Sequence, residues 1–265
     1  MKSQKMYFSC LYLIVILCLF ITFTVPCFAS VDGLVDWYHG TTGYDNALAG
    51  AKKKETPLIM FFYLELDSYC QKLGNVYFSA YDVYSYLEDI PKVDINLGGN
   101  EFELELARKF DVNIDPTLLI SFPFSDLDPV KITPYLENKE MTPQEFVSTL
   151  RNVFSLSYNK IAFSFLENQE YDKAIKYYKS SIKYDPDRAY TYFALASVYH
   201  TKAVEEKNPE YLKNAEVYYL KALKLDTEFK ECKEELEKLY ENMKIMGVAG
   251  QEGGAESGKE LKAVQ

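Results

Sequence analysis

The periodicity of the apolar residues changes once along this chain, near residue 153, and the change restricts the fold to two architectures joined end to end. Before it, short apolar runs bounded by Pro or Gly, at residues 58–64, 92–97 and 117–122, are typical of strands. Amphipathic segments of helical period lie between these runs, at residues 44–53, 69–87 and 101–110. After residue 153 only helical periodicity remains, to about residue 243. We therefore predict an α/β domain followed by an all-α domain.

The N-terminal segment, residues 1–29, has the pattern of a secretory signal peptide. Lys2 and Lys5 precede an apolar run over residues 6–25. In the segment Cys27-Phe28-Ala29 that follows, small residues lie three positions and one position before a cleavage site at Ser30. The pattern predicts an extracytoplasmic protein, periplasmic or secreted. The alternative is an uncleaved helix that anchors the protein, because about 20 apolar residues also span a bilayer. We expect contact with a membrane only through this segment, if it is uncleaved.

Composition excludes several classes of function. The chain has 29 Lys and Arg against 39 Asp and Glu, a formal net charge of −10. This balance argues against nucleic-acid binding, which needs clustered basic residues. The two histidines, His39 and His200, fall in different predicted domains, so we expect no histidine-rich metal site and no cofactor. Residues 246–265 are rich in Gly, Ala, Glu and Lys and lack aromatic residues, which predicts a disordered tail.

Residues 30–153 carry an ordered set of motifs. The set comprises Trp37, Pro57 before the first strand-like run, Cys70, Phe78-Ser79, Val93-Asp94, Asp115-Pro116-Thr117 and Thr142-Pro143. In this order the motifs resemble the thioredoxin-like family, and the resemblance implies the α/β fold of that family. It also implies that Asp115, Pro116 and Thr117 form the cis-proline loop facing the active-site helix, a loop that could hold an extended polypeptide by strand-like pairing.

The chemistry of that family depends on Cys-x-x-Cys at the start of a helix, where the first thiol attacks and the second resolves the mixed disulfide. The aligned segment here reads Asp67-Ser68-Tyr69-Cys70, so the resemblance implies that Asp67 replaces the attacking cysteine and Cys70 is the second one. In an alternative alignment, Tyr69-Cys70 corresponds to the Trp-Cys pair of the family. That alignment needs an insertion before the pair and a deletion after it. We expect Asp67 to cap the helix, and its charge to oppose ionisation of a nearby thiol.

Two interpretations of Cys70 stay open. In the first, Cys70 is a small buried side chain and the domain is redox-inactive, so the protein has no catalytic residue. In the second, Cys70 makes the protein a single-cysteine thiol-disulfide oxidoreductase or isomerase that acts on exported proteins. The sequence also leaves open a Cys70–Cys232 disulfide, which would have to cross the two domains.

The helical part contains an internal repeat. Tyr158, Ile161-Ala162, Phe165, Ala174, Tyr178, Ser181 and Pro186 recur as Tyr192, Leu195-Ala196, Tyr199, Ala215, Tyr219, Ala222 and Thr227. Small residues at these positions let paired helices approach, and the aromatic residues fill the space between neighbours. The pattern resembles tetratricopeptide (TPR) repeats. It implies that residues 154–245 form two repeats, at 155–188 and 189–229, and a capping helix at 230–245.

Such an array binds peptides or proteins on the surface formed by the first helix of each repeat. Helical spacing places six candidate partner-binding residues on that surface: Asn159, Phe163, Leu166, Phe193, Ser197 and His200. The alternative is that some of them pack against the first domain, because two repeats and a cap are fewer than the three units expected of a stable array. The short junction at residues 151–155 favours such docking. We therefore predict a protein–protein interaction protein, an adaptor.

Overall fold

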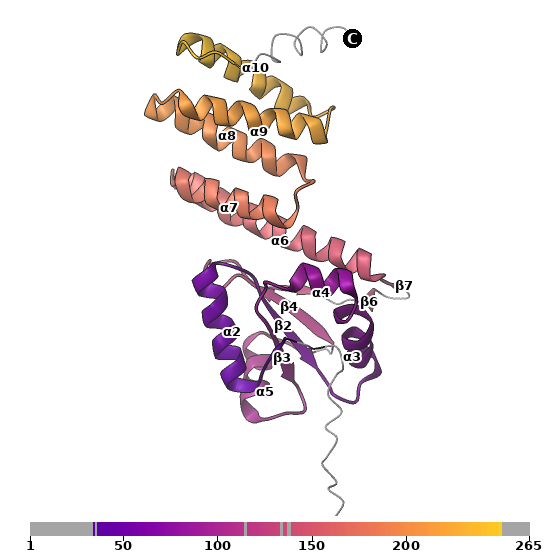
Figure 1. Ribbon diagram of the computed structural model, residues 1–265. Helices are drawn as coiled ribbons and strands as arrows, with labels where there is room; N and C mark the ends of the chain where they lie inside the picture. The colour runs from indigo at the N-terminus through magenta and orange to yellow at the C-terminus, as the bar shows by residue number, and fades with distance from the viewer. Residues whose placement is uncertain (1–33, 35, 114–115, 133–134, 137–138, 251–265) are drawn as a thin grey trace, which may run out of the picture.

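A computed structural model describes residues 34, 36–113, 116–132, 135–136 and 139–250. The first domain is built on a mixed five-stranded sheet with the order β1-β3-β2-β4-β5 (Figure 1). Strands β1, β3 and β2 are parallel, whereas β4 and β5 run antiparallel to their neighbours. The strands are β1 (Tyr38–His39), β2 (Leu58–Tyr63), β3 (Lys92–Asn96), β4 (Thr117–Ser121) and β5 (Val130–Ile132), and a separate pair is formed by β6 (Tyr135–Leu136) and β7 (Lys139–Glu140).

The central strand β2 reads Leu-Ile-Met-Phe-Phe-Tyr, and all six residues are buried because helices cover both faces of the sheet. Helices α2 (Gly40–Lys54) and α5 (Glu101–Lys109) pack on the face that carries Met60 and Phe62. The opposite face, with Phe61, is covered by α3 (Ser68–Lys72), its π-helical continuation η1 (Leu73–Phe78), α4 (Tyr81–Leu87) and the first half of α6 (Pro143–Glu167). This layered arrangement confirms the predicted α/β domain.

The second domain is all helical, as predicted. It comprises the second half of α6, α7 (Tyr171–Tyr184), α8 (Ala189–Glu206), α9 (Glu210–Leu225) and α10 (Lys230–Ile245). Helices α6 and α7 form one antiparallel pair, α8 and α9 form the next, and α10 packs on α9. The four repeat alanines, at positions 162, 174, 196 and 215, are fully buried, so the paired helices approach closely.

Helix α6 differs from the prediction at the domain boundary. The predicted division at residue 153 and the junction at residues 151–155 fall inside this 25-residue helix, which runs unbroken from Pro143 to Glu167. Thr142 and Glu145 form a capping box at its start, and after Pro143 it contains neither Gly nor Pro to stop it. The same helix therefore closes the first domain and opens the first repeat, without a linker.

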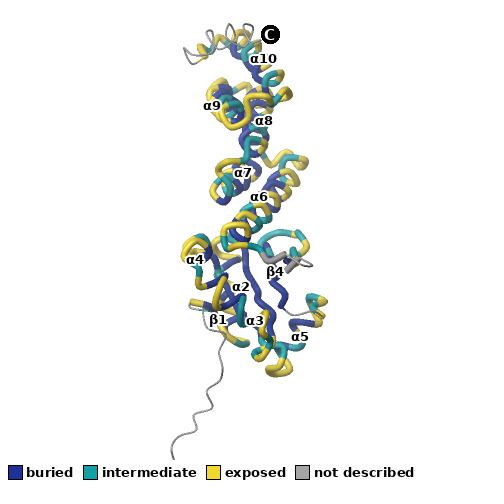
Figure 2. Tube along the Cα trace, turned by 90° about the vertical axis from the view of Figure 1, so that its right-hand side faces the viewer, coloured by how far each residue is buried: buried dark blue, intermediate teal, exposed yellow. Residues whose placement is uncertain are grey.

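The two domains share one hydrophobic core, which runs without interruption from the sheet into the repeats (Figure 2). Tyr158 of α6 lies at its centre, and its hydroxyl donates a hydrogen bond of 2.7 Å to the carbonyl of Glu55. The Glu55 carboxylate lies 2.5 Å from the ammonium of Lys176 on α7. Tyr86 of α4 donates a hydrogen bond of 3.2 Å to the carbonyl of Tyr184. The first domain thus supplies the first repeat with the neighbour that a short array lacks.

Some predicted segments lie outside the described residues: the signal peptide at 1–29 and residues 251–265 of the predicted tail. Among the residues that are described, no helix is both long enough and apolar enough to cross a membrane. In the same residues, no group of three or more His, Cys, Asp or Glu side chains is placed to hold a metal ion.

Candidate functional site

Asp67 lies in extended backbone directly before α3 and caps that helix. Its Oδ1 atom accepts hydrogen bonds from the backbone N–H groups of Tyr69, at 2.9 Å, and Cys70, at 2.8 Å. These are two of the first N–H groups of the helix, which have no partner within the helix itself. The local sequence suffices for this contact, and the predicted capping role of Asp67 is confirmed.

Cys70 lies one turn into the helix and has no exposed surface. Its sulfur accepts the backbone N–H of Leu64 at 3.4 Å, which ties α3 to the end of β2. Neither Cys70 nor Cys232 is in a disulfide, so the pairing that the sequence left open does not occur. Cys232 is also fully buried; it donates to the carbonyl of Tyr219, and burial raises the pKa of its thiol to about 12. A buried thiol cannot reach a client disulfide unless the helix opens.

The surface around the Asp67–Cys70 turn is apolar. The side chain of Leu66 is 86% exposed, and Leu64 and Tyr69 are exposed beside it. Thr117 at the start of β4 pairs with Phe62 of β2, so the buried Pro116-Thr117 segment lies next to the strand that leads into this turn. Asp115, the remaining residue of the predicted loop, lies outside the described residues. The Pro116 segment therefore lies beside β2, whose end leads into the turn.

A second polar cluster lies at the edge of the sheet, and the sequence analysis missed it. The imidazole Nδ1 of His39 on β1 lies 2.8 Å from Oδ1 of Asp94 on β3, and the Tyr63 hydroxyl lies 3.5 Å from the other carboxylate oxygen. Burial raises the pKa of the Asp94 carboxyl, and the hydrogen bond from His39 opposes that rise. The cluster holds an imidazole at the edge of the sheet, where its side chain is 64% exposed. Only the pairing of β1 with β3, 55 residues apart, brings the two side chains together.

Of the six predicted partner-binding residues, two are internal. The amide of Asn159 is buried and donates to the Thr191 hydroxyl at 3.0 Å, joining α6 to α8. The imidazole of His200 is buried 2.8 Å from the Asn242 amide, joining α8 to α10. The prediction that these two residues face a partner is wrong, because the next helix of the array packs over each of them.

The other four candidates lie at or near the surface. Phe163 is 51% exposed, whereas Leu166, Phe193 and Ser197 are partly buried. Leu156 and Tyr190, which the sequence analysis did not select, are exposed as well. We call the surface formed by Leu156, Phe163 and Tyr190 the helix-A face. Its apolar side chains come from α6 and α8, the first helices of the two repeats.

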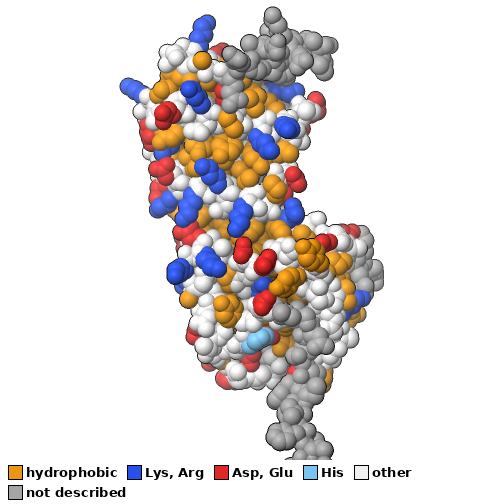
Figure 3. Space-filling view, in the orientation of Figure 1, with side chains coloured by type: hydrophobic (Ala, Val, Ile, Leu, Met, Phe, Trp, Pro, Cys, Tyr) orange, Lys and Arg blue, Asp and Glu red, His pale blue; other side chains and the backbone are white. Residues whose placement is uncertain are grey.

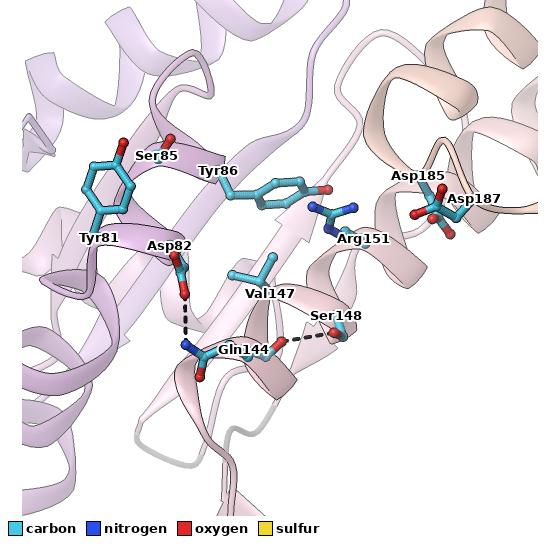
Figure 4. Close-up of a pocket in the computed structure, with 10 residues that line it drawn as sticks. All are labelled: Tyr81, Asp82, Ser85, Tyr86, Gln144, Val147, Ser148, Arg151, Asp185 and Asp187. Atoms are coloured by element: carbon cyan, nitrogen blue, oxygen red, sulfur yellow. Dashed lines mark hydrogen bonds between the residues drawn. The ribbon is translucent and has the colours of Figure 1, made fainter.

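A polar groove of about 750 Å³ lies where the two domains meet, between α4, the start of α6 and the turn from α7 to α8 (Figure 4). The Arg151 guanidinium lies 5.5 Å from the ring centre of Tyr86 and points toward Asp185 and Asp187 across the groove. On the other side, Asp82 accepts a hydrogen bond of 2.8 Å from Gln144. No local sequence pattern marks this groove, because docking of the repeats creates it.

The buried His200 leads to a testable pH dependence. Burial lowers the pKa of its imidazole below the ordinary 6.5, so the folded protein favours the neutral ring that accepts from Asn242. A lowered pKa means that this stabilisation is present above pH 6.5 and is lost as the pH falls through the lowered pKa. We expect stability below pH 6.5 to fall less steeply in His200→Gln than in the wild type. The midpoint of urea denaturation, measured over a series of pH values, tests this expectation. The control is Asn242→Ala, which should lower the midpoint at every pH and leave its dependence on pH unchanged.

Comparison with known proteins supports the repeat assignment. The family model of the TPR repeat matches residues 164–202, which comprise the end of α6, all of α7 and most of α8. A search of curated proteins gave no match. The described chain thus has an α/β domain with a mixed sheet, as the motif resemblance implies, followed by a helical domain that matches the TPR repeat over residues 164–202.

Three solved structures match parts of the chain. A thioredoxin from Thermus thermophilus is 25% identical over 44% of this chain and 85% of its own, with a TM-score of 0.36. Thioredoxin O2 from Arabidopsis thaliana in the oxidized state is 13% identical over 44% of this chain and 92% of its own, with a TM-score of 0.34. The first TPR of Spaghetti (RPAP3) bound to the HSP90 peptide SRMEEVD is 17% identical over 34% of this chain and 93% of its own, with a TM-score of 0.18.

Proposed function

We propose that this protein is an exported protein–protein interaction adaptor whose thioredoxin-like domain is redox-inactive. The observation that carries the proposal is the Asp67–Cys70 turn. A carboxylate occupies the helix cap where the family's attacking thiol would stand, and the remaining thiol of the motif is completely buried. Thiol-disulfide exchange needs an accessible thiolate, and this turn offers none.

The TPR repeats and their exposed surface support the adaptor role. The helix-A face presents Leu156, Phe163 and Tyr190 to solvent, and aromatic side chains such as the last two are common anchors of a protein interface. The partner is a protein or peptide that buries these side chains. The first domain holds the repeats in place through the Tyr158–Glu55 contact, so the helix-A face is displayed on a rigid support.

Export is proposed from residues 1–29, whose charged start, apolar run and small-residue cut site are those of a signal peptide. It places the protein in the periplasm or outside the cell. If the segment is not removed, the protein is held at the membrane by it. Sequencing the N-terminus of the protein recovered from its cell envelope distinguishes the two forms.

Alkylation of Cys70 tests redox inactivity. We expect iodoacetamide to leave Cys70 unmodified in the folded protein and to modify it in urea, because the sulfur becomes accessible only when α3 opens. Mass spectrometry of the Cys70 peptide measures the extent of labelling. The control is Leu66→Cys, which places a thiol at a position that is 86% exposed and should be labelled rapidly. Rapid labelling of native Cys70, with reductase activity that Cys70→Ser abolishes, would favour the single-cysteine oxidoreductase instead.

A further inference from the structure

The second helices of the two repeats, α7 and α9, carry a cluster of lysines that the adaptor proposal does not use. On α7, Lys179 and Lys183 lie one helical turn apart. On α9, spacings of four and three residues place Val217, Lys221 and Lys224 on one side of the helix. We call the surface formed by these five residues with Tyr192 and Tyr218 the helix-B face. In Figure 3, basic side chains are spread over the repeat half of the molecule with hydrophobic side chains exposed between them.

The lysines of this face form no ion pair within the part of the chain that the structure describes. Two other lysines of α7 have carboxylate partners: Lys173 lies 2.5 Å from Glu170, and Lys176 lies 2.5 Å from Glu55. In the described part of the chain, no carboxylate lies within ion-pair distance of the lysines at 179, 183, 221 or 224. In a chain with a net charge of −10, these lysines without ion-pair partners make the face locally positive, although Asp185 and Asp187 lie close enough to raise the pKa of Tyr192.

Two of these lysines, Lys221 and Lys224, line an apolar hollow. A cavity of about 380 Å³ is lined by Tyr192, Val217, Tyr218, Leu220, Lys221 and Lys224. Val217 is 45% exposed, so the hollow is open to solvent. Two lysine ammonium groups lie over tyrosine rings at its border, Lys179 at 5.7 Å from the ring centre of Tyr199 and Lys221 at 5.8 Å from that of Tyr192.

The tyrosines hold these charges at the rim. Tyr199 and Tyr218 are stacked with their ring centres 5.6 Å apart. A hydrogen bond to Tyr199 raises the pKa of Lys179. The aromatic rings attract the ammonium groups, and the aliphatic stems of the lysines extend the apolar surface. The face thus combines fixed positive charges with an apolar depression that can accept a side chain.

We infer that the helix-B face binds an acidic segment of a partner protein, with an aliphatic or aromatic side chain of that segment seated in the hollow. Its carboxylates would pair with Lys179, Lys183, Lys221 and Lys224, and the apolar side chain would displace water from Tyr192, Val217 and Tyr218. The inference rests on the proposed adaptor function and gives the protein a second contact surface, separate from the helix-A face. Two surfaces on one rigid array let an adaptor hold two chains together.

An acidic protein segment fits this face better than another polyanion does. Proteins that bind duplex DNA commonly neutralise about six to ten phosphates, more than these four lysines supply. The acidic remainder of the chain would repel a long nucleic acid or an anionic bilayer, whereas a short segment meets only the lysines. The hollow also suits a protein side chain, since it is lined by apolar groups and lysine stems.

Fluorescence anisotropy with synthetic peptides tests the inference on the full chain. The probes are fluorescein-labelled peptides in which Glu and Asp alternate with Leu and Phe, and matched peptides with Lys in place of the acids or Ser in place of the apolar residues. We expect the peptides that contain both acidic and apolar residues to bind, and we expect added salt to lower their affinity. The double variant Lys179→Glu/Lys221→Glu should weaken binding by at least about tenfold, and Val217→Asp should also weaken it.

Matched variants separate this face from the rest of the repeats. Lys160→Glu makes the same charge change at an exposed lysine of α6 and should leave peptide affinity unchanged. If Phe163→Ala weakens peptide binding and the double variant Lys179→Glu/Lys221→Glu does not, the adaptor proposal stands and the helix-B inference is wrong. Equal affinity for the acidic and lysine-containing peptides, or no binding of either, also overturns the inference.

Other occupants give distinct results. Tighter binding of labelled poly-dT, or of vesicles of phosphatidylcholine and phosphatidylglycerol, through the same lysines would assign the face to nucleic acid or to a lipid surface and overturn the inference. Stronger peptide binding after removal of residues 251–265 would show that the chain's own C-terminal segment occupies the face, which also contradicts a partner site. Unchanged binding after that removal supports the partner.

Discussion

Replacing Tyr158 by Ala is expected to lower the free energy of unfolding by about 3–5 kcal/mol, because the loss of a buried aromatic ring leaves a cavity that neighbours cannot fill. The ring is 1% exposed. It packs edge-on against Phe122 of the first domain and stacks on Tyr184 of the first repeat, with ring centres 5.4 and 5.3 Å away. The substitution therefore removes the centre of the contact between the two domains. Urea denaturation followed by circular dichroism measures the change.

The same experiment separates packing from hydrogen bonding at this position. Tyr158→Phe keeps the ring and removes the hydroxyl, which bonds to the Glu55 carbonyl and to the Tyr184 hydroxyl, so we expect a loss of about 1–2 kcal/mol. Tyr190→Ala, the control, removes an exposed tyrosine of the second repeat and should change stability by less than about 0.5 kcal/mol. If Tyr158→Ala costs no more than Tyr158→Phe, the aromatic stack does not hold the domains together.

Introducing proline at Asn152 is expected to cost about 3 kcal/mol or more and to uncouple the domains. Position 152 is exposed in the middle of α6, close to the residue where the helix passes from the first domain into the repeats. Proline removes the backbone N–H bond to the preceding turn and its ring clashes with the carbonyl of Ser148. Because α6 alone connects the domains covalently, we expect the single unfolding transition of the wild type to split into two.

The matched control is Asn152→Ala. It removes the 2.6 Å hydrogen bond from Arg188 but retains the helix, since alanine is the best helix former. We expect a stability change of less than about 1 kcal/mol and one transition. Near-ultraviolet circular dichroism and intrinsic tyrosine fluorescence follow the two parts. A single transition in Asn152→Pro with the midpoint of Asn152→Ala would mean that the continuity of α6 is not needed for coupling.

The main strands and the helical repeats could be read from the sequence because their signals are local. The runs predicted at 58–64, 92–97 and 117–122 are β2, β3 and β4 within one residue at each end. The strands β1 and β5 were not predicted, because two or three residues are too short to display an alternating pattern. The division near residue 153 was predicted from a change of period, but a change of period does not require a break in the helix.

The candidate site divides in the same way. The cap made by Asp67 could be predicted because it involves residues two and three positions away. The burial of Asn159 and His200 could not, because helical spacing gives the side of a helix on which a residue lies and not which neighbour covers that side. The partner of Asn159 is 32 residues away and that of His200 is 42 residues away.

Local sequence specifies the elements of this protein: where strands and helices form, how α3 is capped and which small residues let the repeat helices pair. These depend on backbone sterics, periodicity and hydrogen bonds between near neighbours. Which elements meet depends on how the whole chain packs. That packing sets Tyr158 against Glu55, His39 against Asp94 and Lys179 of α7 over the Tyr199 ring of α8. Such contacts join residues far apart in the chain, and packing of the whole core selects them.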